Sequence, residues 1–199
     1  MVHYTDSAGV DLFGQWLDAL ADVGTRATIA ARLVRLELGL FGDSKVLGDG
    51  VSELRVDHGP GWRVYYGRQA GRVVLLLAGS DKSGQKASIK NGAQAPGKLE
   101  SKGHPMTHQE WLAGQLQNDA FAAQYLTQAA QDLEPAVFTT ALRHVIDARG
   151  GLAKVADEGN LSRQSLYKAF PLSGRGNPTA KTMFAALRAS GLHLTFTAA

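Results

Sequence analysis

The sequence predicts an α+β N-terminal domain, in which two helices lie on a mostly antiparallel sheet, followed by an all-α domain. Two observations support the first domain: apolar residues recur at helical spacing up to residue 38, and residues 51–78 contain short β-branched and aromatic runs separated by Gly, Pro and Asp. A third supports the second domain, because the chain beyond residue 106 keeps helical periodicity. Helices and strands followed by helices alone indicate two separate domains.

The N-terminal elements follow from their apolar spacing. Leu12 to Leu20 predicts a helix that Asp11 can cap, and Thr25 to Leu38 predicts a second helix that Gly39 ends. The segment 58–61, His-Gly-Pro-Gly, cannot continue a strand and predicts a hairpin turn. The expected strands are Val51 to Val56, Trp62 to Tyr66 and Arg72 to Ala78.

The composition changes after Ser88, where Gly, Pro and polar residues replace core residues, so we expect a linker there. The predicted domains are residues 1–92 and 107–199, joined by a linker at 93–106. The alternation from Leu192 to Phe196 predicts a short terminal strand. The helices expected in the second domain are Thr107 to Gly114, Asp119 to Asp132, Pro135 to Ala148, Leu152 to Glu158, Arg163 to Phe170 and Thr179 to Ser190.

Bulk composition excludes several classes of protein. The chain has 199 residues, of which 44% are hydrophobic, so it can bury a core in each domain. It contains no cysteine, which excludes disulfides and zinc–thiolate sites. The longest apolar run, residues 73–78, is too short to span a membrane, and no signal peptide is evident, so a cytoplasmic location without a membrane partner is expected.

No metal or cofactor is expected. His104 and His108 have the spacing of two ligands on a helix, but Pro105 intervenes and no third ligand is apparent. No glycine-rich phosphate loop is visible.

The charge is unevenly distributed, although the net charge is only +3. Residues 104–149 hold two arginines against five acidic residues, whereas residues 150–199 hold six basic residues against two acidic ones. An acidic segment followed by a basic one favours a nucleic-acid contact in the last part of the chain.

The strongest pattern in the chain lies between residues 151 and 170. Small and apolar residues form a first short helix, Gly159-Asn160 permits a turn with positive φ, and Ser162 can cap a second helix. Leu166 and Phe170 can face the core, which leaves Arg163, Gln164, Ser165 and Lys168 facing outward. Arginine can read guanine, glutamine can read adenine, and serine or lysine can hold phosphate. The alternative is an ordinary helical hairpin with a solvated polar face.

These residues resemble the helix-turn-helix of the HigA-like addiction module antidote proteins. The matching pattern is LA-x-VA-x-x-x-GLSR-x-SLYKA, with Asn160 at the usual position of the glycine, and Gly176-Asn177-Pro178 matches a turn before the last helix. The resemblance implies a homodimer that binds operator DNA through the helix-turn-helix at 151–170. The implied DNA-binding residues are Ser162, Arg163, Gln164, Ser165, Tyr167 and Lys168.

The N-terminal domain carries a series of short motifs in order. They include residues 13–17 (FGQWL), 42–45 (GDSK), 48–55 (GDGVSELR), 59–66 (GPGWRVYY) and 75–85 (LLLAGSDKSGQ). Together these motifs resemble the HigB-like branch of the RelE/ParE toxins, also called addiction module killer proteins, over about residues 1 to 92. The resemblance implies a RelE-like fold and cleavage of mRNA on the ribosome.

Cleavage of RNA by its own 2′-OH needs cations beside the dianionic transition state. Arg63 and Lys82 are the principal candidates, with Arg55, Lys45 and Tyr65 as further ones. Strand periodicity places Arg63 and Tyr65 on one face, and Glu53 and Arg55 likewise share a face. Glu53 and Arg55 can equally form a structural salt bridge, and a strand tyrosine is more often part of a core.

Three functions compete at this point. The first is a toxin–antitoxin fusion, in which an mRNA endonuclease is held in check by, and fused to, a DNA-binding antitoxin that autoregulates its operon. The second is a transcriptional repressor whose N-terminal module has lost catalysis and serves dimerisation. The third is a ParE-like inhibitor of gyrase, which the shared toxin fold does not separate from the first. We also expect the apolar face of residues 110–134, which includes Trp111, Leu116 and Tyr125, to pack on the toxin module, or else to complete the antitoxin's own core.

Overall fold

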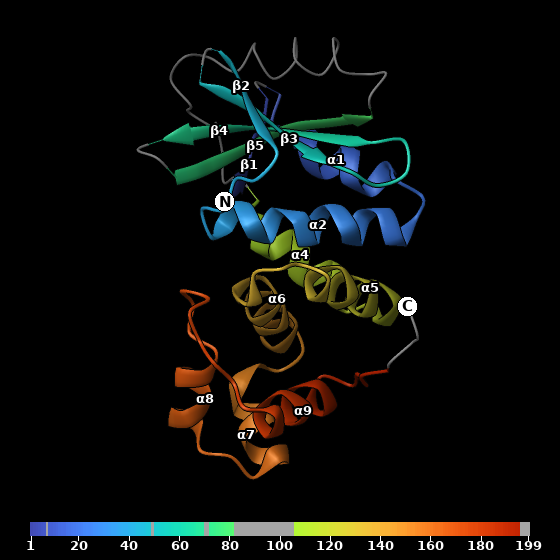
Figure 1. Ribbon diagram of the computed structural model, residues 1–199. Helices are drawn as coiled ribbons and strands as arrows, with labels where there is room; N and C mark the ends of the chain where they lie inside the picture. The colour runs from blue at the N-terminus through green and yellow to red at the C-terminus, as the bar shows by residue number, and fades with distance from the viewer. Residues whose placement is uncertain (7, 49, 70–71, 82–105, 196–199) are drawn as a thin grey trace. The chain divides into compact units, whose positions relative to one another are not determined.

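The computed structural model describes residues 1–6, 8–48, 50–69, 72–81 and 106–195 (Figure 1). The chain divides into two units, Met1–Leu112 and Ala113–Ala199. The boundary between the two units falls inside a helix. It lies beyond residue 107, where the sequence predicts that the second domain starts.

The N-terminal unit is built on a five-stranded sheet in the order β1-β5-β4-β3-β2. The edge strand β1 runs parallel to β5, and the other neighbours are antiparallel, so the mostly antiparallel sheet is confirmed. The strands are β1 (Val2–His3), β2 (Ser44–Gly48), β3 (Val51–Val56), β4 (Trp62–Gln69) and β5 (Arg72–Asp81).

The three expected strands are present, and two edge strands escaped sequence analysis. The strand β1 has only two residues, too few for alternation to be visible, and β2 is an exposed edge strand without a buried face. The predicted turn joins β3 to β4, where the Gly61 amide donates to the His58 carbonyl at 3.1 Å. Gly59 and Gly61 both have positive φ there, which explains the glycines of this turn.

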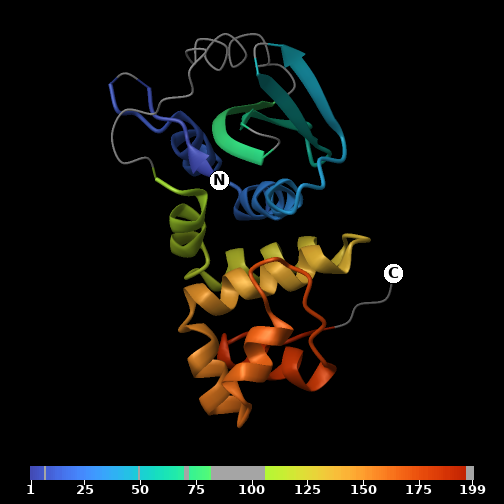
Figure 2. The ribbon, with the colours of Figure 1, turned by 90° about the vertical axis from the view of Figure 1, so that its left-hand side faces the viewer.

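Two helices cover one face of this sheet (Figures 1 and 2). Helix α1 (Leu12–Ala19) begins at the predicted cap Asp11, whose carboxylate accepts from the Gly14 amide at 2.7 Å. Helix α2 (Val23–Glu37) starts before the predicted Thr25, because Asp22 caps it through the Thr25 amide. Strand β5 approaches α1 so closely that a Cβ at Gly79 would collide with the Trp16 ring.

A series of buried polar groups links β1 to α1 and to the start of the next helix. His3 is fully buried, and its Nδ1 lies 2.7 Å from the Asp11 carboxylate. Its Nε2 lies 3.1 Å from Nδ1 of His108, the first residue of α4 (His108–Gln115). The Trp111 indole donates to Asp18 of α1 at 3.0 Å. His108, Trp111 and Leu112 are buried and therefore belong to the core of the N-terminal unit.

The C-terminal unit is helical, and each helix expected from the sequence is present. The terminal residues 192–195 do not form the predicted strand, because alternation produces a strand only where another strand pairs with it. The helices after α4 are α5 (Asp119–Ala130), α6 (Pro135–Ala148), α7 (Gly151–Gly159), α8 (Arg163–Ala169) and α9 (Ala180–Ala189).

Arg149, just after α6, ties three segments of the C-terminal unit together. Its guanidinium donates to the Leu116 carbonyl at 2.8 Å and to the Ser190 carbonyl at 2.9 Å, and it pairs with Asp119 at 2.8 Å. The side chain is only 11% exposed. One arginine thus satisfies two carbonyl groups left over at helix ends, which places α5 and α9 relative to α6.

We expect Arg149→Met to lower the free energy of unfolding of the C-terminal unit by about 2–4 kcal/mol, because two carbonyls lose a charged donor. Urea unfolding followed by far-UV circular dichroism measures the loss. The control is Arg175→Met, since the Arg175 side chain is exposed and its replacement should change stability by less than about 0.5 kcal/mol. Equal effects of the two replacements would contradict the structural role of Arg149.

The pKa of Asp11 lies below its ordinary value of 3.8: burial opposes ionisation, but hydrogen bonds from His3 and the Gly14 amide outweigh it. A depressed carboxyl pKa stabilises the fold above pH 3.8, and this contribution is lost as the pH falls through the lower folded value. Asp11→Asn keeps the helix cap and removes the charge beside His3. We expect this variant to be less stable than the unmodified chain at pH 6, with the difference shrinking as the pH approaches 3.

Tryptophan fluorescence measures this difference, because Trp16, Trp62 and Trp111 are the three tryptophans and all lie in the N-terminal unit. Asp22→Asn is the comparison variant: the pKa of Asp22 is also lowered, mainly by hydrogen bonds from the Thr25 hydroxyl and amide, so this variant shows the pH dependence that a helix cap gives without a buried histidine bonded to it. A stability difference for Asp11→Asn that does not change with pH would refute the charge interaction with His3.

Candidate functional site

Helices α7 and α8 form a tight helix-turn-helix. Helix α7 runs through Gly159 and ends at Asn160, which adopts a left-handed conformation with φ of 47°. Sequence analysis expected both residues of this pair to supply the turn, but only Asn160 does. Gly159 has a different role, because a Cβ there would lie 3.0 Å from the Cβ of Ala185 on α9. The glycine therefore lets α7 pack closely on α9.

The predicted faces of α8 are confirmed. Ser162 caps the helix by accepting from the Ser165 amide at 3.5 Å, and Leu166 is buried. Phe170, which follows the helix, is fully buried. The four residues expected to face outward, Arg163, Gln164, Ser165 and Lys168, are all exposed, and so are Ser162 and Tyr167, the other two implied DNA-binding residues. The helix thus presents a continuous polar and cationic surface.

The ion pair on this surface leaves its cationic side chains accessible to other anions. Arg163 lies 3.5 Å from Asp157 on α7, but both side chains are well exposed, so the pair contributes little and can be exchanged for another anion. Lys168 is exposed at the other end of α8. A cationic helix face of this kind can hold phosphates and reach base edges.

Sequence analysis missed Arg143 on α6, which positions α8. Its guanidinium donates to the Phe170 carbonyl, pairs with Asp147 at 2.8 Å and lies 5.9 Å from the centre of the Tyr167 ring. The contact joins residues far apart in the sequence, so no local pattern reveals it. The loop after α8 is also fixed, because a Cβ at Gly176 would collide with the Ala169 carbonyl oxygen.

A second candidate site lies on the sheet face opposite to α1 and α2. Cross-strand register pairs Lys45 with Glu53, Glu53 with Tyr65 and Arg55 with Arg63. Residues directly opposite each other share a face, so the predicted pairs, Arg63 with Tyr65 and Glu53 with Arg55, lie on one face, and Lys45 of β2 joins them. The four candidates Lys45, Arg55, Arg63 and Tyr65 therefore come together, whereas Lys82 lies outside the described residues.

Glu53 is the centre of this group. Its carboxylate is buried and lies 3.1 Å from Arg55 Nε and 3.3 Å from Arg63 Nε. The first contact is a hydrogen bond, while the second lacks hydrogen-bond alignment and is electrostatic. Asp43 adds a weaker pair with Arg55 at 3.7 Å. Two carboxylates thus offset the charge of two guanidinium groups, so the face is less cationic than its arginines suggest.

The pKa of Arg55 is raised by its hydrogen bond to Glu53 and by Asp43, so the guanidinium stays charged. The pKa of Tyr65 is also raised, first by burial and then by the Glu53 charge, against the hydrogen bond with Ser80. Tyr65 is fully buried in an apolar cluster with Tyr4, Val51 and Leu77. It therefore remains a neutral phenol, able to donate a proton but not to accept one as a base. Lys45 is exposed.

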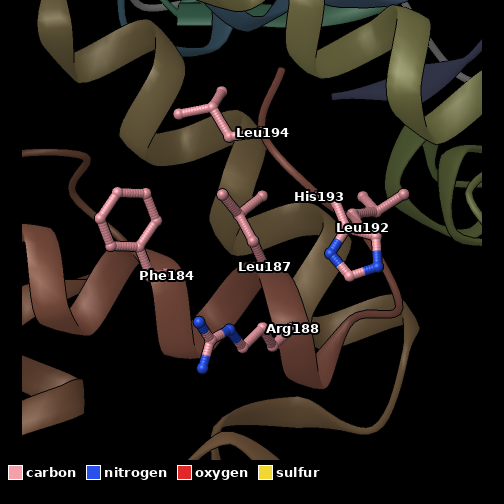
Figure 3. A pocket seen from close by; sticks show the side chains of 6 residues that line it. All are labelled: Phe184, Leu187, Arg188, Leu192, His193 and Leu194. Carbon is pink, nitrogen blue, oxygen red and sulfur yellow. The ribbon is translucent and has the colours of Figure 1, made fainter.

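A shallow hollow lies on α9 and the residues that follow it (Figure 3). Leu187 and Leu194 lie between Phe184 on one side and Leu192 and His193 on the other. Phe184 and Leu194 are about half exposed. The hollow is mainly apolar and lacks a converging set of acid and base groups, so it is suited to contact with a protein surface.

Two other features are absent from the described residues. No group of three or more His, Cys, Asp or Glu side chains among them is arranged to hold a metal ion. None of their helices is long and apolar enough to cross a membrane.

Comparison with known proteins identifies the C-terminal part of the chain. Residues 107–198 match the model of a family described as "Probable addiction module antidote protein". A protein of Haemophilus influenzae, described as "Uncharacterized protein", is 49% identical over 78 residues, which are 39% of this chain and 79% of that relative. No solved structure gives a significant match. Through its residues 107–198, the chain therefore belongs to the family of probable addiction module antidote proteins.

Proposed function

We propose that this protein is a toxin–antitoxin fusion. Its antidote part binds operator DNA and regulates its own operon, and its N-terminal module is an endoribonuclease of the RelE/ParE type that cleaves mRNA on the ribosome. The observation that carries the antidote half is the exposed polar face of α8, which the buried side chains of Leu166 and Phe170 hold against the core. The toxin half is supported by the shared sheet face of Lys45, Arg55, Arg63 and Tyr65.

The DNA-binding half uses α8 as a recognition helix in the major groove. Arg163 and Gln164 lie in its first turn, where side chains reach base edges, and Lys168 near its end contacts a phosphate. Arg143 holds the helix in place through Phe170, so the reading side chains are preorganised.

Two copies of the chain bind a palindromic operator. The apolar surface around Phe184, Leu187 and Leu194 supports such a dimer, since exposed apolar residues grouped on one surface mark contact sites.

The RNase half depends on positive charge more than on a general base. The 2′-oxygen attacks the adjacent phosphorus and gives its proton to water, the bond from phosphorus to the 5′-oxygen breaks, and the leaving oxygen takes a proton from water, which yields a 2′,3′-cyclic phosphate and a free 5′-OH. Arg63 stabilises the negative charge that develops on the phosphate oxygens. Glu53 fixes the orientation of Arg63 and Arg55, and Lys45 provides an exposed cation at the edge of the same face. Tyr65 supports the strand from the core.

One observation favours the alternative of a repressor with an inactive toxin-like module. Glu53 and Asp43 offset the charge of the two arginines, and Tyr65 is buried away from solvent. A face with little net charge attracts RNA weakly. Measurement of cleavage separates the two functions.

We expect Arg163→Ala to weaken binding to the protein's own promoter by about 1–3 kcal/mol, because a base contact is lost. Lys168→Ala should weaken binding to all sequences similarly and reduce the slope of log affinity against log salt by about one. Fluorescence anisotropy with labelled promoter DNA at several salt concentrations measures both effects. Lys181→Ala on α9 is the control for general charge. Unchanged promoter affinity in the Arg163→Ala, Lys168→Ala double variant would contradict the assignment of α8 as the recognition helix.

We expect Arg63→Met to reduce mRNA cleavage on programmed ribosomes by on the order of 10²-fold, because a cation beside the transition state is lost. Lys82→Met should have a comparable effect. The assay uses two forms of the protein: the full chain, and a fragment that ends at residue 117 and so lacks most of the inhibiting antidote part. The fragment keeps residues 106–112 because they belong to the N-terminal unit. Arg68→Met is the control, because Arg68 stacks on Phe41 instead of joining the Glu53 group. Absence of cleavage by both unmodified forms would favour the repressor.

A further inference from the structure

Residues 107–112 have two properties at once. They begin the segment that matches the antidote family, which starts at residue 107. They also lie in the N-terminal unit, which extends to Leu112. The residues that contact the N-terminal sheet are therefore the antidote's own, and the predicted linker at 93–106 ends just before them.

The first contact adds this segment to the edge of the sheet. Thr107 forms an antiparallel bridge with Val2 of the edge strand β1. The His3 amide donates to the Met106 carbonyl at 3.0 Å, and the His108 amide donates to the Met1 carbonyl at 3.1 Å. Main-chain pairing with an exposed strand edge is a general mode of peptide recognition.

The second contact is a buried set of side chains beside α1, where the start of α4 lies (Figure 2). If His3 donates Nδ1–H to Asp11, its Nε2 accepts from the Nδ1–H of His108, so both short contacts are satisfied. The His108 ring stacks on Trp111 at 5.5 Å, and the Trp111 indole donates to Asp18. A histidine at position 108 can thus satisfy the buried ring nitrogen of His3.

The third feature is the way that the segment changes direction from strand to helix. Thr107 and Glu110 form a capping box, in which the Thr107 amide donates to Glu110 at 2.8 Å and the Glu110 amide donates to the Thr107 hydroxyl at 3.1 Å. Glu110 thus completes the cap at the start of α4. The cap fixes His108 and Trp111 on the side of the helix that is buried.

We propose that Met106–Leu112 is a latch that holds the antidote part on the N-terminal unit by non-covalent contacts, independently of the peptide that joins them. The docking site is the outer edge of β1 together with α1, and its occupant is this segment of the same chain. The latch occupies the α1 side of the sheet and does not include Arg55 or Arg63. Its existence does not require that the N-terminal unit be a toxin.

The experiment uses the full chain with a protease recognition sequence inserted between Gly97 and Lys98. After folding and complete cleavage, the N-terminal fragment lacks the latch and the C-terminal fragment carries it. We expect the two fragments to elute together in gel filtration. We also expect the His3 and His108 amides to keep hydrogen-exchange protection within about tenfold of the uncut chain.

His108→Leu preserves size and removes the hydrogen bond to His3, which leaves a buried polar atom. We expect this variant to raise the dissociation constant of the cut fragments by about ten- to a hundredfold. Gln109→Leu is the matched control on the exposed side of the same helix and should leave the dissociation constant unchanged. Circular dichroism of the uncut variants checks that they fold.

Separation of the unmodified fragments after cleavage would overturn the proposal. Loss of protection at His3 and His108 in fragments that stay together would also overturn it, because another contact would then hold them. This exchange measurement on the unmodified chain still decides the matter if His108→Leu fails to fold. Failure of DNA binding or of RNA cleavage leaves the latch unaffected, so the two proposals are tested separately.

Discussion

The hydrogen bond between His3 and His108 joins the two ends of the N-terminal unit, and much of the structure depends on it. His3 is held by Asp11, which also caps α1, so the helix cap, the edge strand and the start of α4 share one polar group. These groups are buried, and a buried polar group without a partner is costly. The antidote-type segment is therefore structurally continuous with the N-terminal unit for its first residues.

The two candidate sites are supported in different ways. Helix α8 presents its polar side chains to solvent while Leu166 and Phe170 anchor it, so its binding residues are exposed and its position is fixed. The sheet face around Glu53 has the opposite character, because its charges are paired with one another and its tyrosine is buried. The first arrangement is typical of a recognition surface. In the second, the proposed RNA substrate would have to compete with Glu53 for the arginines.

The apolar residues after His108 illustrate how one helical pattern can serve two cores. Sequence analysis grouped Trp111, Leu116 and Tyr125 as one face that packs either on the toxin module or within the antidote. Trp111 belongs to the N-terminal unit, whereas Leu116 and Tyr125 belong to the C-terminal unit. The periodicity of a helix shows which residues are buried but not which neighbour buries them.

The sequence by itself determined the helices, the three long strands, the turn at His58–Gly61 and the outward face of α8, because each depends on residues close together in the chain. It also indicated that Arg63 lies on one face with Tyr65 and Glu53 with Arg55, since alternation along a strand fixes which residues share a face, whereas Lys45 was a candidate by its charge alone. Only the tertiary structure decided that Glu53 binds both arginines, that Arg143 supports α8 and that His3 meets His108. These contacts join residues that strand register and helix packing bring together, and the local spacing of residues predicts neither the register nor the packing.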